Sequence, residues 1–478
     1  MFIELDKNSG VPVKKQLYDA ITSKILKREL AKGERLPSTR ELAGRLGIAR
    51  NTVIEIYDQL TAEGYLEAYH GRGTFVAGEF DGAVPKDTLP EKRTGSSARR
   101  TRHRYRIDFT SGIPDLKSFP VKAWLRALKE SIQEVAEDRL GYGSVLGYLP
   151  LRESLTRYLL RYKGISCSPE QVVIVNGTSD AMLLCALLFR QSVSDLMVES
   201  AVVSFVPDIF RMFGYNLIPL KIDQYGLCTK DLPPVEDGLI FCSPSHQFPL
   251  GGTLPIERRI QLTDYAEKYR NYIIENDYDS EFIYSGAQVN SLYQLTPGQV
   301  IHVGTFSKTL APFLRLGYMV VPEELAPKVK ELQSRLYRRV NTHMQMALHH
   351  LLEEGIYVKH VAAMRKRYKK KMQCMINALR DAFGDSIRIY GTNSGLHVAV
   401  VFPEPLFDAG SLRIFLKHKV SVDLLTDYTI HQQETCDTLI LGFGNLEQNA
   451  IIEGAKRLKA AVSELADMKG VSNWISTP

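Results

Sequence analysis

The chain lacks long apolar runs, paired cysteines and an apolar stretch near its first residues, and each absence argues against a class of protein. No uninterrupted apolar stretch approaches the roughly 20 residues that a membrane span needs, so no membrane partner is expected. The six cysteines are scattered without a C-x-x-C pair, which argues against a zinc site or a disulfide framework. We therefore expect no bound metal. Because the N-terminus has no apolar signal region, we expect a cytoplasmic protein.

A strong excess of charge is also missing. The net charge is only +6 over 478 residues, so any nucleic-acid partner has to be inferred from local clusters of basic residues. The length suggests two or three domains.

Three regions differ in composition. Residues 1–77 are regularly patterned, and residues 107–478 alternate short apolar strands with amphipathic helices. Between them, residues 78–106 are poor in large apolar groups, with seven Lys or Arg and no acid from Lys92 to Arg106. We expect this segment to be a mobile basic linker. It is either a solvated tether or a segment whose basic side chains contact DNA phosphates.

The first region predicts three helices and a hairpin. Apolar residues four apart predict the first helix, and Ser38 and Glu41 fit a capping box at the start of the second. Gly47 supplies a turn, and a third helix follows with an apolar face that consists of Val53, Ile56, Tyr57 and Leu60. Two short strands, 65–69 and 74–76, then flank His70–Gly73. This order is typical of a winged helix-turn-helix, although a purely structural helical bundle is the alternative.

The stretch "LPSTRELAGRLGIARNTVIEIYDQLTAEGYL", followed by "GRGTFV", resembles the winged helix-turn-helix of GntR-type bacterial regulators. The resemblance covers about residues 11–77. It implies that Ser38 and Arg40 contact DNA phosphates, and that Arg72 lies on the wing. It also implies that Arg50, Asn51 and Thr52 face base edges or the DNA backbone, a choice that the sequence leaves open.

The large region carries a lysine in a setting that suits covalent chemistry. The segment "GTFSKTLAPFLRLGY" follows the apolar strand 300–303 and contains Ser307, Lys308 and Arg315. A lysine forms a Schiff base only when its amine can be neutral, which burial and a nearby cation favour. Hydroxyls and an arginine suit an anionic phosphate. Alone, such a Ser-Lys pair is commonly a solvated surface pair.

Further polar clusters follow other predicted strands. Gly177–Ser179 lies between a strand and a helix, where free backbone N–H groups suit a phosphate. "SPSHQFPLGG" and "YIIENDYDSEF" also begin where apolar strands end. Since ligands gather beyond the carboxyl ends of strands in open α/β sheets, we expect these clusters to meet in one site.

Together these segments resemble the fold-type-I aminotransferases that use pyridoxal 5'-phosphate (PLP), and with the first region they resemble the MocR/GabR type of transcription regulators. The resemblance implies a winged helix-turn-helix joined to a large α/β aminotransferase-like domain, whose smaller α+β subdomain spans about 370–478. It implies a homodimer that binds operator DNA and a small-molecule effector. The implied cofactor-binding set is Lys308 for the Schiff base, Ser307, Arg315, Gly177, Thr178 and Ser179 for the phosphate, Tyr278 for the phenolic oxygen, Asn276, His246 and Gln247 around the cofactor, and Tyr142 for the partner's phosphate.

Three positions depart from this family pattern. The acid expected at the pyridine nitrogen falls on Asn276, which carries no charge, although the neighbouring Asp277 replaces it if the backbone shifts. Asn445 stands where some members have an arginine for a substrate carboxylate. Val203 stands where an aromatic residue usually stacks on the ring, a place that Phe205 can take instead. We interpret the three changes as lost or altered turnover.

We therefore expect a PLP-binding transcription regulator whose aminotransferase-like domain senses an amino compound or PLP itself, with weak or vestigial transaminase activity at most. One alternative is a working aminotransferase with an attached DNA-binding module. The other is a DNA-binding dimer that has lost PLP.

Overall fold

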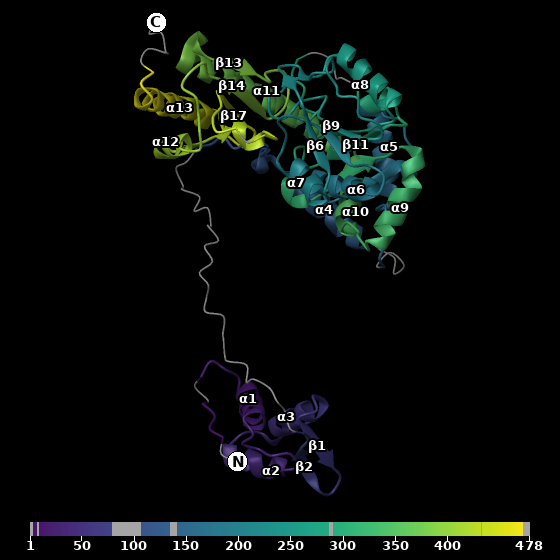
Figure 1. Ribbon diagram of the computed structural model, residues 1–478, viewed down its shortest axis with the longest axis vertical. Helices are drawn as coiled ribbons and strands as arrows, with labels where there is room; N and C mark the ends of the chain where they lie inside the picture. The colour runs from purple at the N-terminus through teal and green to yellow at the C-terminus, as the bar shows by residue number, and fades with distance from the viewer. Residues whose placement is uncertain are drawn as a thin grey trace. The chain divides into compact units, whose positions relative to one another are not determined.

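The computed structural model describes residues 3–6, 9–78, 107–133, 141–285, 290–431 and 433–471. The chain divides into two compact units, Met1–Thr101 and Arg102–Pro478 (Figure 1). Each unit has its own buried apolar clusters. Apart from Gly78, the expected linker 78–106 lies outside the described residues.

The first unit has the predicted three helices and hairpin. Its elements are α1 (Val13–Leu26), α2 (Thr39–Leu46), α3 (Arg50–Ala62), β1 (Leu66–Tyr69) and β2 (Gly73–Val76), with β1 and β2 antiparallel. The Oγ of Ser38 accepts a hydrogen bond from the Glu41 N–H (3.2 Å), which caps α2. Gly47 then ends α2 with a φ of 61°, a left-handed conformation that glycine adopts without strain.

The second unit contains, within the described residues, a seven-stranded sheet that is mostly parallel, as the sequence predicts. Only β12 runs antiparallel to its neighbours β4 and β11. The strands, in sheet order, are β4 (Val172–Val175), β12 (Gly317–Val320), β11 (Val300–Thr305), β10 (Tyr272–Asp277), β9 (Leu239–Cys242), β5 (Asp195–Glu199) and β6 (Asn216–Leu220).

Successive residues of each strand join different apolar clusters, because side chains alternate between the two faces of a sheet. Ile273 belongs to one cluster and Ile274 to the other. The cluster of Ile274 includes α6 (Thr178–Phe189), α7 (Phe205–Met212) and α9 (Ala326–Arg335). The cluster of Ile273 includes α4 (Val121–Gln133), α5 (Leu149–Lys163), α8 (Ile256–Lys268) and α10 (Thr342–Glu353).

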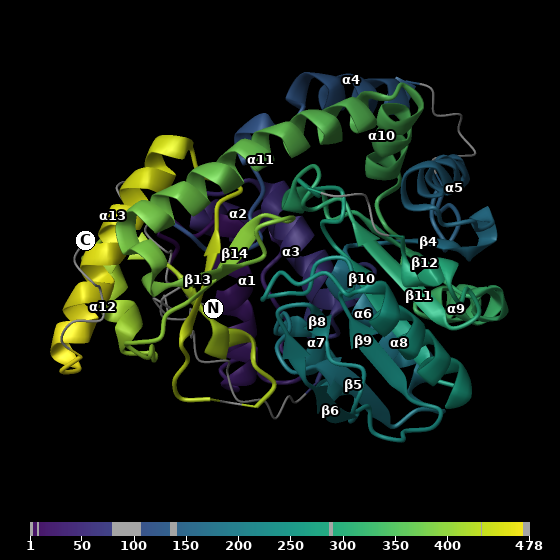
Figure 2. The same cartoon turned by 90° about the horizontal axis from the view of Figure 1, so that it is seen from above.

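A smaller sheet follows towards the C-terminus, as expected for an α+β subdomain. Within the described residues it has the order β13 (Arg388–Tyr390), β14 (His397–Val401), β17 (Thr438–Gly442) and β16 (Asp423–Leu424). The accompanying helices are α11 (Ile356–Phe383), α12 (Ser411–Lys417) and α13 (Gln448–Met468). Figure 2 shows α11 running from α10 to α13 and so linking the two sheets.

Two short strand pairs complete the unit. In one, β7 (Ile222–Asp223) pairs with β8 (Gly226–Leu227). In the other, β3 (Ile107–Asp108) runs parallel to β15 (Val420–Ser421). This pairing places Ser111 and Gly112, which follow β3 in the chain, beside the smaller sheet. None of the helices in the described part of the chain combines the length and apolarity that a membrane crossing requires.

Candidate functional site

A cavity of about 380 Å³ lies beyond the carboxyl ends of β4, β10 and β11, where α/β sheets bind ligands. Its walls come from segments far apart in the sequence. The lining residues are Ser111, Gly112, Thr178, Ser179, Val203, Phe205, Phe248, Asn276, Tyr278, Asp279, Thr305, Ser307, Lys308, Pro312, Arg315, Leu396, His397 and Tyr428.

One part of the wall, which we call the donor end, consists of Thr178, Ser179, Ser307 and Arg315. The guanidinium of Arg315 donates a hydrogen bond to the Ser179 Oγ (3.3 Å). Thr178 and Ser179 open α6 directly after its N-cap Gly177, whose φ of 99° favours glycine. A helix N-terminus, hydroxyls and an arginine together suit a phosphate group.

Lys308 lies next to the donor end with its amine inside the protein. Its Nζ donates a hydrogen bond to the carbonyl oxygen of Gly112 (2.5 Å). Burial lowers the pKa of Lys308, while the carboxylate of Asp279 acts in the opposite direction. The lowered pKa increases the population of the neutral, nucleophilic amine. Of the two causes named from the sequence, burial lowers the pKa, and no nearby cation contributes to the shift.

The cavity face of β10 ends in an amide rather than a carboxylate. Asn276 and Tyr278 both line the cavity, as strand alternation predicts. The Asn276 Nδ2 donates to the Ser243 Oγ (3.2 Å), and its buried Oδ1 has no hydrogen-bond partner among the described residues. An unpaired buried amide atom in a cavity wall indicates a place for a ligand group that completes it.

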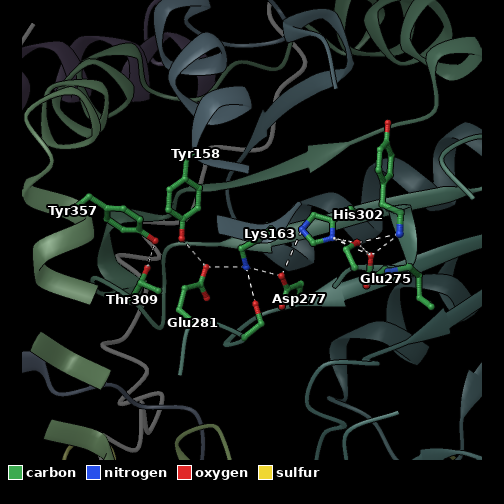
Figure 3. Close-up of polar contacts among 12 residues, drawn as sticks. Tyr158, Lys163, Glu275, Asp277, Glu281, His302, Thr309 and Tyr357 are labelled. Carbon is green, nitrogen blue, oxygen red and sulfur yellow. Dashed lines mark hydrogen bonds and ion pairs between the residues drawn. The ribbon is translucent and has the colours of Figure 1, made fainter. Parts of the chain in front are cut away.

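The opposite face of β10 carries the charge. Asp277 forms an ion pair with the Lys163 Nζ (2.6 Å), and Lys163 also pairs with Glu281 (2.9 Å). Figure 3 shows this buried network continuing through His302 to Glu275. Burial alone would raise the pKa of Asp277, but the neighbouring Lys163 ammonium lowers it below its ordinary value. Asn276, and not Asp277, therefore faces the cavity.

Four residues of the expected cofactor set are not among the lining residues. One is Gly177, the N-cap of α6. His246 is buried behind Tyr278, with its Nδ1 within hydrogen-bond distance of the Tyr278 hydroxyl and the Asp279 carboxylate (both 2.9 Å). Gln247 uses its amide within its own loop and on the carbonyl of Ala201 (3.0 Å).

The fourth is Tyr142, which is 86% exposed with the Arg339 guanidinium 5.4 Å from its ring centre.

The other departures from the family pattern have different outcomes. Val203 and Phe205 both line the cavity. Asn445 does not; it is exposed, and its Oδ1 accepts a hydrogen bond from the Leu116 N–H (3.4 Å). The expectation that position 445 faces the ligand is therefore wrong for this structure. The residues that line the cavity, and not Asn445, determine which ligand groups can bind.

Several lining residues escaped the sequence analysis. Asp279 follows Tyr278 within the quoted motif, and Phe248 lies within "SPSHQFPLGG", so both had a local signal. Ser111, Gly112, His397 and Tyr428 reach the cavity only through the pairing of β3 with β15 and the packing of the smaller sheet, which local sequence does not encode.

The expected DNA-binding residues lie on the surface of the first unit. Ser38, Arg40, Arg50, Asn51 and Arg72 are exposed, and Thr52 is half-buried. The Arg50 Nε donates to the Thr39 Oγ1 (3.4 Å), so the first turn of α3 lies beside the start of α2. Arg72 lies in the turn between β1 and β2.

Comparisons with known proteins agree with both units. The family model "Bacterial regulatory proteins, gntR family" matches residues 13–76, and "Aminotransferase class I and II" matches residues 105–436. An HTH-type transcriptional regulator of Bacillus subtilis (strain 168), YdeL, is 34% identical over 96% of this chain and 98% of its own length. The probable rhizopine catabolism regulatory protein MocR of Rhizobium meliloti is 33% identical over 96% of this chain and 95% of its own. The chain belongs to the MocR type of GntR-family transcription regulators.

The second unit of this MocR-type regulator has the fold-type-I aminotransferase fold. It is similar to the α-aminoadipate aminotransferase LysN of Thermus thermophilus, solved with N-(5'-phosphopyridoxyl)-L-leucine, with a TM-score of 0.68 and 25% identity over 79% of this chain and 97% of that one. The fold and this phosphopyridoxyl group imply PLP as the cofactor. The cavity fits it, because a donor end suited to a phosphate, a partly buried lysine and an unpaired amide atom line one space.

Proposed function

We propose that this DNA-binding regulator works as a homodimer that holds PLP on Lys308 and changes its operator affinity when a small molecule enters the cavity. The observation that carries the proposal is that one cavity is lined both by the donor end, which suits a phosphate, and by Lys308, whose pKa is lowered by burial. The exposed ring of Tyr142 leaves it available to a second copy of the chain, as the family resemblance implies.

At the donor end, Ser307, Arg315 and the first turn of α6 would hold the phosphate. Arg315 is already oriented by its hydrogen bond to Ser179, so little side-chain entropy is lost on binding. Tyr278 would bond the phenolic oxygen. From behind, His246 holds the Tyr278 hydroxyl in place, and Asp279 holds the His246 ring.

The role of Lys308 follows from its burial. When bound, the cofactor supplies an aldehyde that condenses with primary amines and a ring that withdraws electrons. The Gly112 carbonyl orients the Lys308 amine, and the desolvated surroundings favour its neutral form.

Asn276 favours sensing over turnover. A carboxylate at the pyridine nitrogen stabilises its protonated, electron-withdrawing form, whereas an amide offers a hydrogen bond without charge. The nearest acid on the strand, Asp277, is occupied by Lys163 on the opposite face. This arrangement argues against the alternative of an efficient aminotransferase.

PLP itself is a second candidate for the sensed molecule. The observation that favours it is the donor end, which offers a phosphate several partners before any amine is considered. In that case occupancy by PLP, and not exchange of an amine on it, would change operator affinity.

On the DNA side, we assign phosphate contacts to Ser38 and Arg40, groove contacts to Arg50, Asn51 and Thr52, and the wing contact to Arg72. Their exposure around the starts of α2 and α3 and in the β1–β2 turn supports this assignment.

The test uses the full-length protein and duplex DNA selected by it from a random pool. The wild type with PLP should show the absorbance of a lysine-bound cofactor, and its operator affinity should change on adding PLP or an amine. Lys308→Ala should abolish both effects, while Lys330→Ala, at an exposed lysine of α9, should change neither. If the Lys308→Ala protein responds like the wild type, the proposed function is wrong.

A further inference from the structure

The cavity has a second distinctive part, which we call the acceptor end. It consists of Ser111, Gly112, His397 and Tyr428, with the carboxylate of Asp423 directly behind them. The Asp423 Oδ2 accepts hydrogen bonds from the Ser111 N–H and from the Tyr428 hydroxyl, both 2.8 Å. The Ser111 Oγ lies 3.1 Å from the same Tyr428 hydroxyl.

The directions of these hydrogen bonds follow from the carboxylate. An ionised carboxylate only accepts, so Tyr428 must donate its proton to Asp423. Burial raises the pKa of Tyr428, and Asp423 adds to this, so the hydroxyl keeps its proton. Ser111 must then donate to Tyr428, which leaves the lone pairs of the Ser111 Oγ for a ligand.

His397 also presents an acceptor. Its Nε2 lies 3.0 Å from the Pro249 carbonyl oxygen, which can only accept, so Nε2 carries the hydrogen. Burial lowers the pKa of His397 well below its ordinary value, and His246 and Lys308 lower it further. The neutral ring therefore keeps a lone pair on Nδ1.

The charges of the wall point the same way. Among the described residues that line the cavity, Lys308 and Arg315 are the only lysine and arginine, and PLP would engage both. The acids are Asp279 in the wall and Asp423 one hydrogen bond behind it. A ligand carboxylate would meet like charge and no free cation, at a cost that low local dielectric increases.

We infer that the ligand sensed at this site is a primary amine with a second hydrogen-bond-donating group, an ammonium or a hydroxyl, and without a carboxylate. The inference rests on the proposed function, because the primary amine would replace the Lys308 amine on the cofactor and release that lysine as a free amine, while the second group binds the acceptor end. Asp423 acts as the specificity-determining residue through Tyr428 and Ser111.

The experiment titrates the PLP-loaded full-length protein with three amines of equal chain length and follows the cofactor absorbance. Putrescine carries a second ammonium, n-butylamine a methyl group and γ-aminobutyrate a carboxylate. We expect putrescine to bind roughly tenfold or more tightly than n-butylamine, as a charge-assisted hydrogen bond allows, and γ-aminobutyrate to bind most weakly.

Two variants locate the preference. Asp423→Asn should remove most of the advantage of putrescine, and Tyr428→Phe should reduce it while keeping the ring packed against Phe248 (centroids 4.8 Å apart). The matched control is Asp427→Asn, because Asp427 lies outside the cavity lining and only caps the Leu424 N–H (3.0 Å). It should keep the wild-type order of affinities.

The outcomes separate this inference from the proposed function. The inference is overturned if γ-aminobutyrate binds as tightly as putrescine, even where a cation from a second copy of the chain is the cause. It is also overturned if Asp423→Asn and Tyr428→Phe both keep the wild-type preference for putrescine. If the wild type never shows lysine-bound cofactor absorbance, the proposed function itself fails.

Discussion

The functional residues of the two units differ in how they are held. In the first unit, the expected DNA-binding side chains lie at helix starts and in a turn, and all of them except the half-buried Thr52 are exposed. In the second unit, the strand end of β10 is buried, and its acids Glu275 and Asp277 belong to one network of ion pairs and hydrogen bonds (Figure 3). A substitution at the DNA surface should therefore act locally, whereas one at β10 should spread.

Strand β10 itself shows what burial demands. Its acids Glu275 and Asp277 lie on the network face, where Lys163 and His302 neutralise them, and its amide Asn276 lies on the cavity face. The charge that an aminotransferase would place under its cofactor is present in this strand but used for structure. A shift of one residue along the strand would exchange the side chains of the network face and the cavity face.

The largest effect is expected from Lys163→Met. It leaves the carboxylates of Asp277 and Glu281 buried without their cation, which typically costs about 3–5 kcal/mol in the free energy of unfolding. Denaturant unfolding followed by tryptophan fluorescence measures it for the second unit alone, because Trp124 lies in the core of that unit and the sequence of the first unit has no tryptophan.

The control for Lys163→Met is Arg161→Met, at an exposed position of the same last turn of α5, which should cost about 0.5 kcal/mol or less. Equal unfolding free energies for the two variants would mean that the network does not need its lysine, and the contrast between the buried and exposed sites would fail.

The next largest effect is expected from Asn276→Asp. A carboxylate there would make a charge-assisted hydrogen bond to the protonated pyridine nitrogen, worth about 1.5–3 kcal/mol. Single-turnover amino transfer from a common amino acid to the bound cofactor, followed by absorbance, should become roughly tenfold or more faster. Asn276→Ser removes the amide without adding charge and should give no gain. No gain in Asn276→Asp would show that this residue does not control turnover.

Local sequence was sufficient for much of the fold. The apolar stripes of α1 and α3, the cap at Ser38 and the turn at Gly47 all depend on neighbours within a few residues. The alternation along β10 likewise places Asn276 and Tyr278 on one face without any tertiary information. Half of the donor end follows too, since Ser307 and Arg315 lie within one motif.

The remainder depended on contacts between distant segments. That Asp277 is held away from the cavity follows from Lys163, more than 100 residues earlier in the chain. The acceptor end needs Ser111, Asp423 and Tyr428 in contact, which only the pairing of β3 with β15 achieves. Position 445 was misjudged because the turn after β17 directs its side chain towards Leu116.

At the exposed surface, Arg50→Ala should weaken operator binding by about 1–3 kcal/mol and leave cofactor absorbance unchanged. The slope of binding against salt concentration should fall by about one unit if the guanidinium contacts a phosphate, because one less counterion is released. Arg45→Ala, at an exposed arginine in the last turn of α2 that pairs with Glu41, is the matched control. If both variants bind the operator like the wild type, α3 is not the recognition helix.

The smallest effect is expected at Ser38, where capping and DNA contact can be separated. Ser38→Ala loses the hydrogen bond to the Glu41 N–H and should cost about 1 kcal/mol of local stability, seen as faster hydrogen exchange at Glu41. Ser38→Asp keeps a capping oxygen but adds a negative charge at the exposed start of α2. It should preserve exchange protection yet weaken operator binding through repulsion of phosphate. If Ser38→Asp binds the operator as tightly as the wild type, Ser38 only caps its helix, and the surface of the first unit is as much a structural network as the strand end of β10.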